Sequence, residues 1–269
     1  MSHEHQREVL ASGQSYEPFV GRWSRAVAKE FLRWLGVPSE RRWLDVGCGT
    51  GALAETILTS ASPAAITAVD PSAAFIEFAH QQISDPRVTF RVGDAQALPV
   101  ETASVDAVVS GLVLNFIPDP RKALSEMKRA VMQGGLVALY VWDYAGEMQM
   151  LRYFWDAAAA LNPSASELDE GQRFPICRPE GLDELLKAVG LGDTEVRSID
   201  VATVFVDFDD YWSPFLGGQG AAPAYAMSLS EDERLALREH IRQSLPVERD
   251  GSIHCIARAW AAKGRRNFS

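Results

Sequence analysis

The sequence is poor in cysteine, and it lacks both a long apolar run and an internal repeat. Its three cysteines, Cys48, Cys177 and Cys255, lie far apart and form no Cys-x-x-Cys or Cys/His ligand spacing. This spacing indicates neither a disulfide framework nor a metal site, and it fits a reducing, cytoplasmic compartment. No apolar core of a signal peptide and no run of about 18 apolar residues is present, so we expect neither export nor a membrane partner.

Positive charge is also scarce. The chain has 26 Lys and Arg against 36 Asp and Glu, a formal net charge of −10. Binding to a phosphate backbone depends on cationic side chains, so nucleic acid is not expected as a partner. Apolar residues make up 47% of the 269 residues, with seven Trp and twelve Phe, which is enough to form a packed core.

Stretches that predict strands alternate with stretches that predict helices. Val27, Phe31 and Leu35 recur at helical spacing, and Ser24 is placed to cap that helix. The alternation that follows indicates a parallel sheet with right-handed crossovers. We expect an α/β fold with a seven-stranded, mostly parallel sheet and helices on both faces. The expected strands are 42–46, 65–69, 88–92, 105–110, 136–142, 195–206 and 252–261, and the expected helices are 25–35, 51–59, 72–82, 120–131 (ended by Gly134-Gly135) and 179–189.

Three segments do not follow this alternation. Residues 1–23 are expected to form an N-terminal arm or lid, and residues 24–269 the main domain. Within that domain, residues near 145–178 and 207–250 are expected to be helical or loop insertions over the active site. The second insertion contains Ser230-Glu-Asp-Glu233, a capping box that predicts a helix with Leu237, Ile241 and Leu245 on one face.

The strongest motif is Trp43-Leu-Asp-Val-Gly-Cys-Gly-Thr-Gly51, a buried strand that leads into a glycine-rich turn and then a helix. Gly47 and Gly49 allow the backbone to approach a ligand closely, because they carry no Cβ. Asp70 ends the next strand, where a carboxylate can accept hydrogen bonds from both hydroxyls of an unphosphorylated ribose. Together the strand, turn, helix and acid predict a nucleoside-binding βαβ unit.

Over roughly residues 20–142 the sequence resembles class I S-adenosylmethionine-dependent methyltransferases, in particular the ubiquinone/menaquinone-biosynthesis or "type 11" group. The resemblance implies a Rossmann-like fold, S-adenosyl-L-methionine as cofactor and a role as a methyltransferase. It also implies that Asp94 binds the adenine amino group, that Ala95 gives a backbone N–H to the ring, and that the strand ending at Leu112 exits beside the methionine part. The cofactor-binding residues expected on these grounds within the motifs are Asp45, Gly47, Cys48, Gly49, Asp70, Pro71, Asp94, Ala95 and Leu112.

The arm offers further candidates. Arg22 could pair with the carboxylate of the cofactor, while Tyr16 or Trp23 covers its sulfonium end. The alternative is an arm that packs on the sheet edge with Arg22 in solvent.

Two other functions are compatible with parts of the sequence. Gly47-x-Gly49-x-x-Ala52 also fits the loose dinucleotide-binding pattern of a nicotinamide oxidoreductase. Asp45 argues against that function, because a carboxylate before the turn would repel a pyrophosphate. The second alternative is a protein that binds the cofactor without transferring methyl, since no catalytic residue is compelling.

The methyl acceptor is expected above the strand ends, where open α/β sheets bind ligands. Ser110 to Asn115 lacks the Pro-Pro-aromatic signature of amino methyltransferases acting on adenine or glutamine, which leaves a small organic molecule as the expected acceptor and a protein side chain as the alternative. Asp143 and His254 are weak candidates for a base, and the protein is expected to be a monomer or homodimer. The acceptor-site candidates are Asn115, Phe116, Trp142, Asp143 and Tyr144, with a lid of aromatics that more often form a core: Tyr153, Phe154, Trp155, Phe208, Tyr211, Trp212 and Phe215.

Overall fold

The structure is a computed structural model that describes residues 22–217 and 220–267. Its strands are β1 (Arg42–Val46), β2 (Ala65–Asp70), β3 (Val88–Val92), β4 (Val105–Gly111), β5 (Val131–Trp142), β6 (Gly192–Phe205) and β7 (Ile253–Arg265). Its longer helices are α3 (Arg22–Leu35), α4 (Ala52–Ser60), α5 (Ala73–Gln82), α6 (Pro120–Ala130), α7 (Gln149–Leu161), α9 (Pro179–Ala188), α11 (Ala221–Ser228) and α12 (Glu231–Ser244). Shorter helical turns are η2 (Leu114–Phe116), η3 (Pro163–Leu168), α8 (Glu170–Arg173), α10 (Phe208–Trp212) and η4 (Ser213–Gly217).

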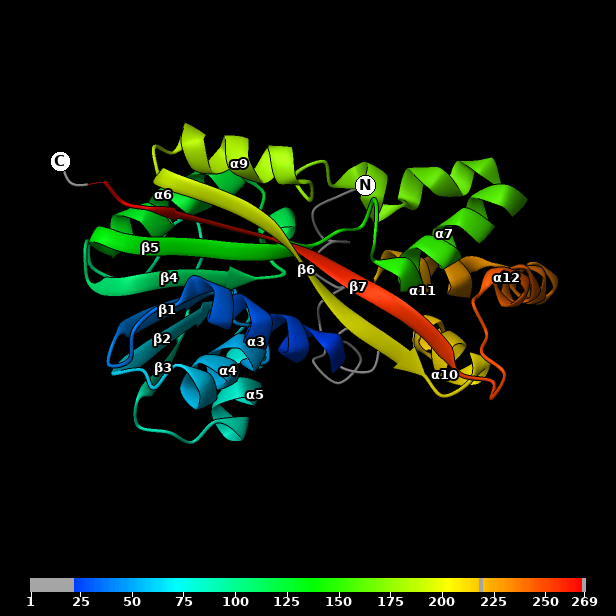
Figure 1. The fold of residues 1–269 in the computed structure, drawn as a ribbon, viewed down its shortest axis with the longest axis horizontal. Helices are drawn as coiled ribbons and strands as arrows, with labels where there is room; N and C mark the ends of the chain where they lie inside the picture. Colours follow the sequence, from blue (N-terminus) through cyan, green and yellow to red (C-terminus); the bar gives the residue numbers. More distant parts are fainter. Residues whose placement is uncertain (1–21, 218–219, 268–269) are drawn as a thin grey trace. The chain divides into compact units, whose positions relative to one another are not determined.

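The strands form a seven-stranded sheet in the order β3-β2-β1-β4-β5-β7-β6 (Figure 1). Pairing is parallel from β3 through β5, for example Asp45 with Ala68 on β2 and with Val109 on β4. β7 runs antiparallel to β5, because Gly134 N–H bonds Arg266 O near one end and Asp143 N–H bonds Arg258 O near the other. The predicted seven-stranded, mostly parallel sheet is confirmed.

Two compact units divide the described residues. The first, here called the motif unit, contains residues 24–141, 176–199 and 259–267, and the second, the helical unit, contains residues 22–23, 142–175 and 200–258. In the motif unit, α6 contacts α9, whereas α4 and α5 lie close together and apart from these two helices (Figure 1). Its core consists of fully buried side chains such as Val27, Phe31, Leu44, Ile57 and Val108.

The aromatic side chains of the two insertions form the core of the helical unit. Phe154 stacks on Phe215 with ring centroids 4.6 Å apart, and Trp155 lies 5.8 Å from Tyr225. Of the seven aromatics considered for a lid, six are buried: Phe154, Trp155, Phe208, Tyr211, Trp212 and Phe215. Burial in a core therefore accounts for these six side chains. No helix in the described part of the chain is long and apolar enough to cross a membrane.

Two local predictions were wrong. Helix α3 begins at Arg22, so Ser24 lies inside its first turn and does not cap it. Helix α6 ends at Ala130, and Gly134-Gly135 belongs to β5 instead of terminating the helix. Val105 pairs with Val131 but Ala107 with Leu136, so β5 carries extra residues, and Gly134 absorbs them with a φ of +73°.

Candidate functional site: a nucleoside-binding turn at the strand ends

The glycine-rich turn after β1 is held against the end of β2. The amides of Gly47 and Cys48 both donate to the carbonyl of Val69, at 2.7 and 3.0 Å. Gly47 has a φ of +74°, and a Cβ on it would lie 2.5 Å from the Val113 side chain. Gly49 has a φ of +51°, and a Cβ there would have no atom of a described residue within 4 Å. Position 47 thus has to be glycine for the turn to pack against Val113. At position 49, no described atom lies close to the place that a side chain would occupy.

Asp70, at the end of β2, points toward this turn. Its Oδ2 accepts a hydrogen bond from the Gly49 amide and its Oδ1 one from the Ser72 amide, both at 2.9 Å. Burial raises the pKa of this carboxyl, while the two amides partly oppose the rise. Each carboxylate oxygen keeps a second lone pair that can accept a further hydrogen bond. The following Pro71 is exposed.

Asp45, inside β1, is 1% exposed. Neither of its carboxyl oxygens has a hydrogen-bond partner within 3.5 Å in the described part of the chain. Burial and then the nearby Asp70 raise the pKa of Asp45 to about 7, although the Ala54 amide lowers it slightly. A buried acid without donors is costly unless a ligand supplies them.

Cys48 lies in the turn between these two acids. Burial, followed by the charges of Asp45 and Asp70, raises the pKa of the Cys48 thiol far above its usual range. A thiol in this environment stays protonated, and the thiolate is the nucleophilic form. Cys48 therefore contributes its backbone to the turn and not a reactive sulfur.

The segment after β3 joins the same end of the sheet. The Gly93 amide donates to the carbonyl of Asp70 at 3.0 Å, which places Asp94 and Ala95 beside β2. Asp94 is exposed, and its Oδ1 accepts from the Gln96 amide at 2.8 Å. This turn fixes the carboxylate and leaves Ala95 half-buried.

The exit of β4 completes the cluster. Leu112 is buried with a φ of +61°, a left-handed conformation that is rare for leucine, and its amide donates to Tyr140 O at 2.8 Å. The turn brings Val113 onto Gly47. Beyond it, the amide nitrogen and oxygen of Asn115 are both buried with no hydrogen-bond partner among the described residues, and the same holds for the Ser110 hydroxyl. Sequence reasoning did not place Ser110 in the site, and its only signal was a hydroxyl at the end of an apolar strand.

The remaining sequence candidates belong to the helical unit or fall outside the described residues. Tyr16 falls outside the described residues, and so does the side chain of Arg22. Trp23 is buried edge-on against Phe205, with ring centroids 5.3 Å apart. Asp143 is buried and accepts from the Glu147 amide at 2.9 Å within its own loop. His254 is exposed on β7, with its Nε2 3.1 Å from the Ser252 hydroxyl.

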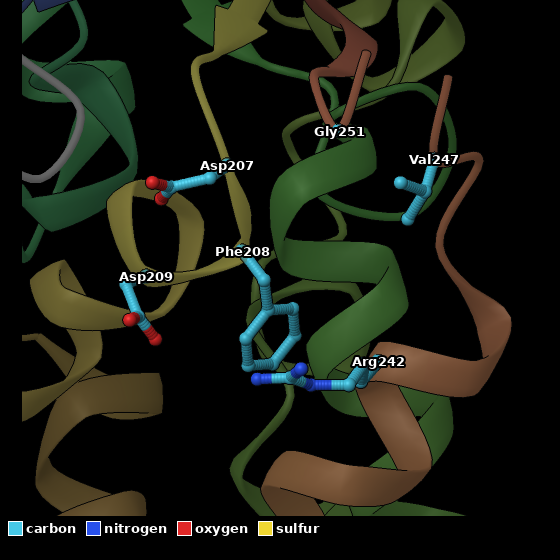
Figure 2. A pocket seen from close by; sticks show the side chains of 6 residues that line it. All are labelled: Asp207, Phe208, Asp209, Arg242, Val247 and Gly251. Atoms are coloured by element: carbon cyan, nitrogen blue, oxygen red, sulfur yellow. The ribbon is translucent and has the colours of Figure 1, made fainter. Parts of the chain in front are cut away.

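The helical unit contains a pocket of about 340 Å³, and Phe208, one of the aromatics considered for a lid, is among the residues that line it (Figure 2). The guanidinium carbon of Arg242 lies 4.3 Å from the centroid of the Phe208 ring, and that of Arg238 lies 5.0 Å away. Asp209 is paired with Arg238 at 2.8 Å. Acidic and basic side chains thus surround a buried aromatic ring at this pocket. Packing of α10 against α12 explains these contacts.

The fold and the acids at its strand ends define the class I type of methyltransferase fold. Residues 44–139 match the family model described as a methyltransferase domain. This match confirms the resemblance to methyltransferases predicted from the four motif segments.

Curated relatives are similar to parts of the chain. It is 36% identical over 92 residues to malonyl-[acyl-carrier protein] O-methyltransferase of Hahella chejuensis, covering 34% of this chain and 33% of the relative. It is 28% identical over 212 residues to 2-methyl-6-phytyl-1,4-hydroquinone methyltransferase of Synechocystis sp., covering 72% and 65%. The alignments thus span less than two thirds of these relatives.

Among solved structures, phosphoethanolamine N-methyltransferase 2 of Haemonchus contortus, in complex with S-adenosyl-L-methionine, superposes with a TM-score of 0.61 at 20% identity. The match covers 97% of this chain and 60% of that one. At this identity the likeness establishes the fold alone.

Proposed function

We propose that this protein is an S-adenosyl-L-methionine-dependent methyltransferase that acts on a small organic acceptor. The observation that carries the proposal is the hydrogen bond from the Gly49 amide to Asp70, which joins the glycine turn to the acid of the next strand. A ligand lying over Gly49 then meets a carboxylate that is already oriented. The methyltransferase domain match over residues 44–139 supports this assignment.

The residues of the motif unit fit the parts of this cofactor. Asp70 would accept the ribose hydroxyls, and Asp94 with the Ala95 amide would bind the adenine. Among the described residues, no hydrogen-bond donor lies within 3.5 Å of either carboxyl oxygen of Asp45, which suits this acid to the ammonium of the amino-acid part. Backbone of Gly47, Cys48 and Gly49 would line the ligand, with Pro71 and Leu112 at its edges. Tyr16, Arg22 and Trp23 remain proposed contacts from the N-terminal arm.

The cofactor supplies an electrophilic methyl group when bound. The protein then has to hold the acceptor in line with that group, and alignment of this kind supplies a large share of the rate. A base is needed only for acceptors that must lose a proton, and Asp143 and His254 remain candidates for such a role. Relatives named for O-methylation of a malonyl group and for methylation of a hydroquinone support an organic acceptor.

Calorimetric titration tests the proposal. The protein should bind S-adenosylmethionine and S-adenosylhomocysteine, and NAD should not compete with either. Transfer of a tritiated methyl group to a panel of phenols, hydroquinones and carboxylic acids then separates an enzyme from a binding protein. Absence of binding at millimolar ligand, or tighter binding of NAD, would refute the assignment.

A further inference from the structure

The inference concerns the proton on Asp45, and it rests on the proposed function. We propose that Asp45 is protonated in the ligand-free protein and releases its proton when the α-ammonium group of the cofactor binds. Cofactor binding is then coupled to proton release. The carboxylic acid O–H ionises, the proton passes to the solvent, and the resulting carboxylate is neutralised by the ligand cation.

The surroundings of Asp45 support a neutral acid before binding. Its side chain is 1% exposed, and both oxygens lack a partner within 3.5 Å among residues 22–217 and 220–267. An isolated ionised carboxylate in such a place loses its hydration and gains nothing in return, so the protonated form is favoured. The Ala54 amide, on α4, lowers the pKa of Asp45, but by less than burial raises it.

The charges around Asp45 favour the same state. The end of β2 contributes Asp70, a second acid whose charge would repel an ionised Asp45. The turn contributes Cys48, which stays protonated, and β4 contributes Val109, the uncharged register partner of Asp45. On α4, Glu55 is exposed and paired with Arg25 at 3.4 Å. Among the described residues, no cation is close enough to contribute to the pKa of Asp45.

A ligand cation reverses this balance. A charge-assisted hydrogen bond between an ammonium and a carboxylate is roughly twice as strong as a neutral one. Below the pKa of Asp45 the ligand must displace a proton, so its affinity falls about tenfold for each pH unit. Above that pKa the affinity no longer depends on this group.

Proton release can be measured by titrating the protein with S-adenosylhomocysteine in buffers of different ionisation enthalpy. At pH 6 we expect nearly one proton released per ligand bound, and at pH 8 almost none. Asp45→Asn should bind more weakly at pH 8 and release no proton at either pH. The control variant Glu77→Gln, which alters an exposed acid on α5, should behave like the wild type.

The choice of ligand identifies the group that triggers release. S-Adenosylmethionine and S-adenosylhomocysteine share the α-ammonium, whereas 5′-methylthioadenosine lacks it. Release is expected with the first two ligands and not with the third. Release with all three, or with S-adenosylmethionine alone, would contradict the role of the ammonium.

A measurement without ligand separates this inference from the proposed function. The carboxyl carbon signal of Asp45, assigned by its loss in Asp45→Asn, should titrate near neutral pH in the free protein. A midpoint near 4 would overturn the inference even if the cofactor binds. Failure of the wild type to bind any of the three ligands at pH 8 would refute the proposed function and the coupling with it.

Discussion

At the scale of the residue, Asp70 has the most direct geometry for a ligand. Its carboxylate is fixed by two amides at 2.9 Å and retains lone pairs for ribose hydroxyls. We predict that Asp70→Ala weakens S-adenosylhomocysteine binding by about 1–3 kcal/mol, because the hydroxyls lose a charged acceptor. Calorimetry checks this value, with Asp85→Ala as the control, since Asp85 is paired with Arg87 outside the site. Equal affinities of Asp70→Ala and the wild type would show that Asp70 does not bind the ribose.

The two glycines of the turn should respond differently to alanine. A Cβ at position 47 would meet Val113 at 2.5 Å, while one at position 49 would meet no described atom. Gly47→Ala should therefore destabilise the fold by roughly 1–3 kcal/mol, from the clash and the positive φ. Gly49→Ala should cost only about 1 kcal/mol of stability but lower ligand affinity at least tenfold. Denaturant unfolding and calorimetry on both variants test the contrast, and the reverse order would contradict it.

Asp45 should make the stability of the free protein depend on pH. Its pKa is raised from 3.8 to about 7, so the native state binds more protons than the unfolded state between these values. The contribution of Asp45 to stability is thus complete below pH 4 and is lost as the pH rises through 7. Three pH units correspond to about 4 kcal/mol. Between pH 4 and pH 8, the free energy of unfolding should therefore fall less in Asp45→Asn than in the wild type. Urea unfolding at a series of pH values measures this, and an equal fall in both proteins would disprove it.

At the scale of the element, some boundaries were predictable from local chemistry. Strands β1 and β3 have the predicted bounds, and α12 has the predicted capping box, in which Ser230 and Glu233 bond each other's backbone. In both cases the deciding residues are adjacent in sequence. The start of β5 was not predictable, because a glycine pair that suggests a helix end is used as a bulge whose backbone partner is Arg266, just after β7.

The capping box gives a prediction at this scale. The Ser230 side chain accepts from the Glu233 amide at 3.3 Å, and Glu233 accepts from the Ser230 amide at 2.9 Å. Ser230→Ala should lower stability by about 0.5–2 kcal/mol without changing cofactor affinity. Ser230→Asp, which keeps a capping oxygen, should restore most of the loss. Thermal unfolding of the three proteins checks this, and a loss that Asp fails to restore would rule out capping as the cause.

At the scale of the whole molecule, the sequence predicted the seven-stranded sheet better than it predicted the packing of side chains. The alternation of strands and helices predicted that β1, β2 and β3 are parallel, so that their carboxyl ends lie at the same edge of the sheet. The structure brings Asp45, Asp70 and Asp94 to that edge. It could not show that the Asn115 amide is buried without a partner, because burial depends on packing between distant segments. It also could not show that the insertion aromatics pack on one another within a unit of their own.

Ligand binding should stabilise the molecule as a whole. A ligand that binds only the native state at 100 times its Kd adds about 2.7 kcal/mol to the free energy of unfolding. S-Adenosylhomocysteine should therefore raise the midpoint of thermal unfolding by several degrees, while the same concentration of NAD should leave it unchanged. Asp70→Ala serves as the matched control, and at equal ligand concentration its shift should be smaller. Equal shifts with NAD and S-adenosylhomocysteine would contradict a site built for the methyl donor.

The end of α6 depends on a residue made much later in synthesis. The Arg266 guanidinium donates to the carbonyls of Arg129 at 3.0 Å and Val131 at 2.7 Å, across a separation of 135 residues in the latter case. Carbonyls at a helix terminus have no partner within the helix. On the ribosome, α6 and the bulge of β5 must therefore wait until residue 266 has left the exit tunnel before their final bonds can form. The bonds of Arg266 to the end of α6 therefore form only after strands β1 to β6 have been synthesised.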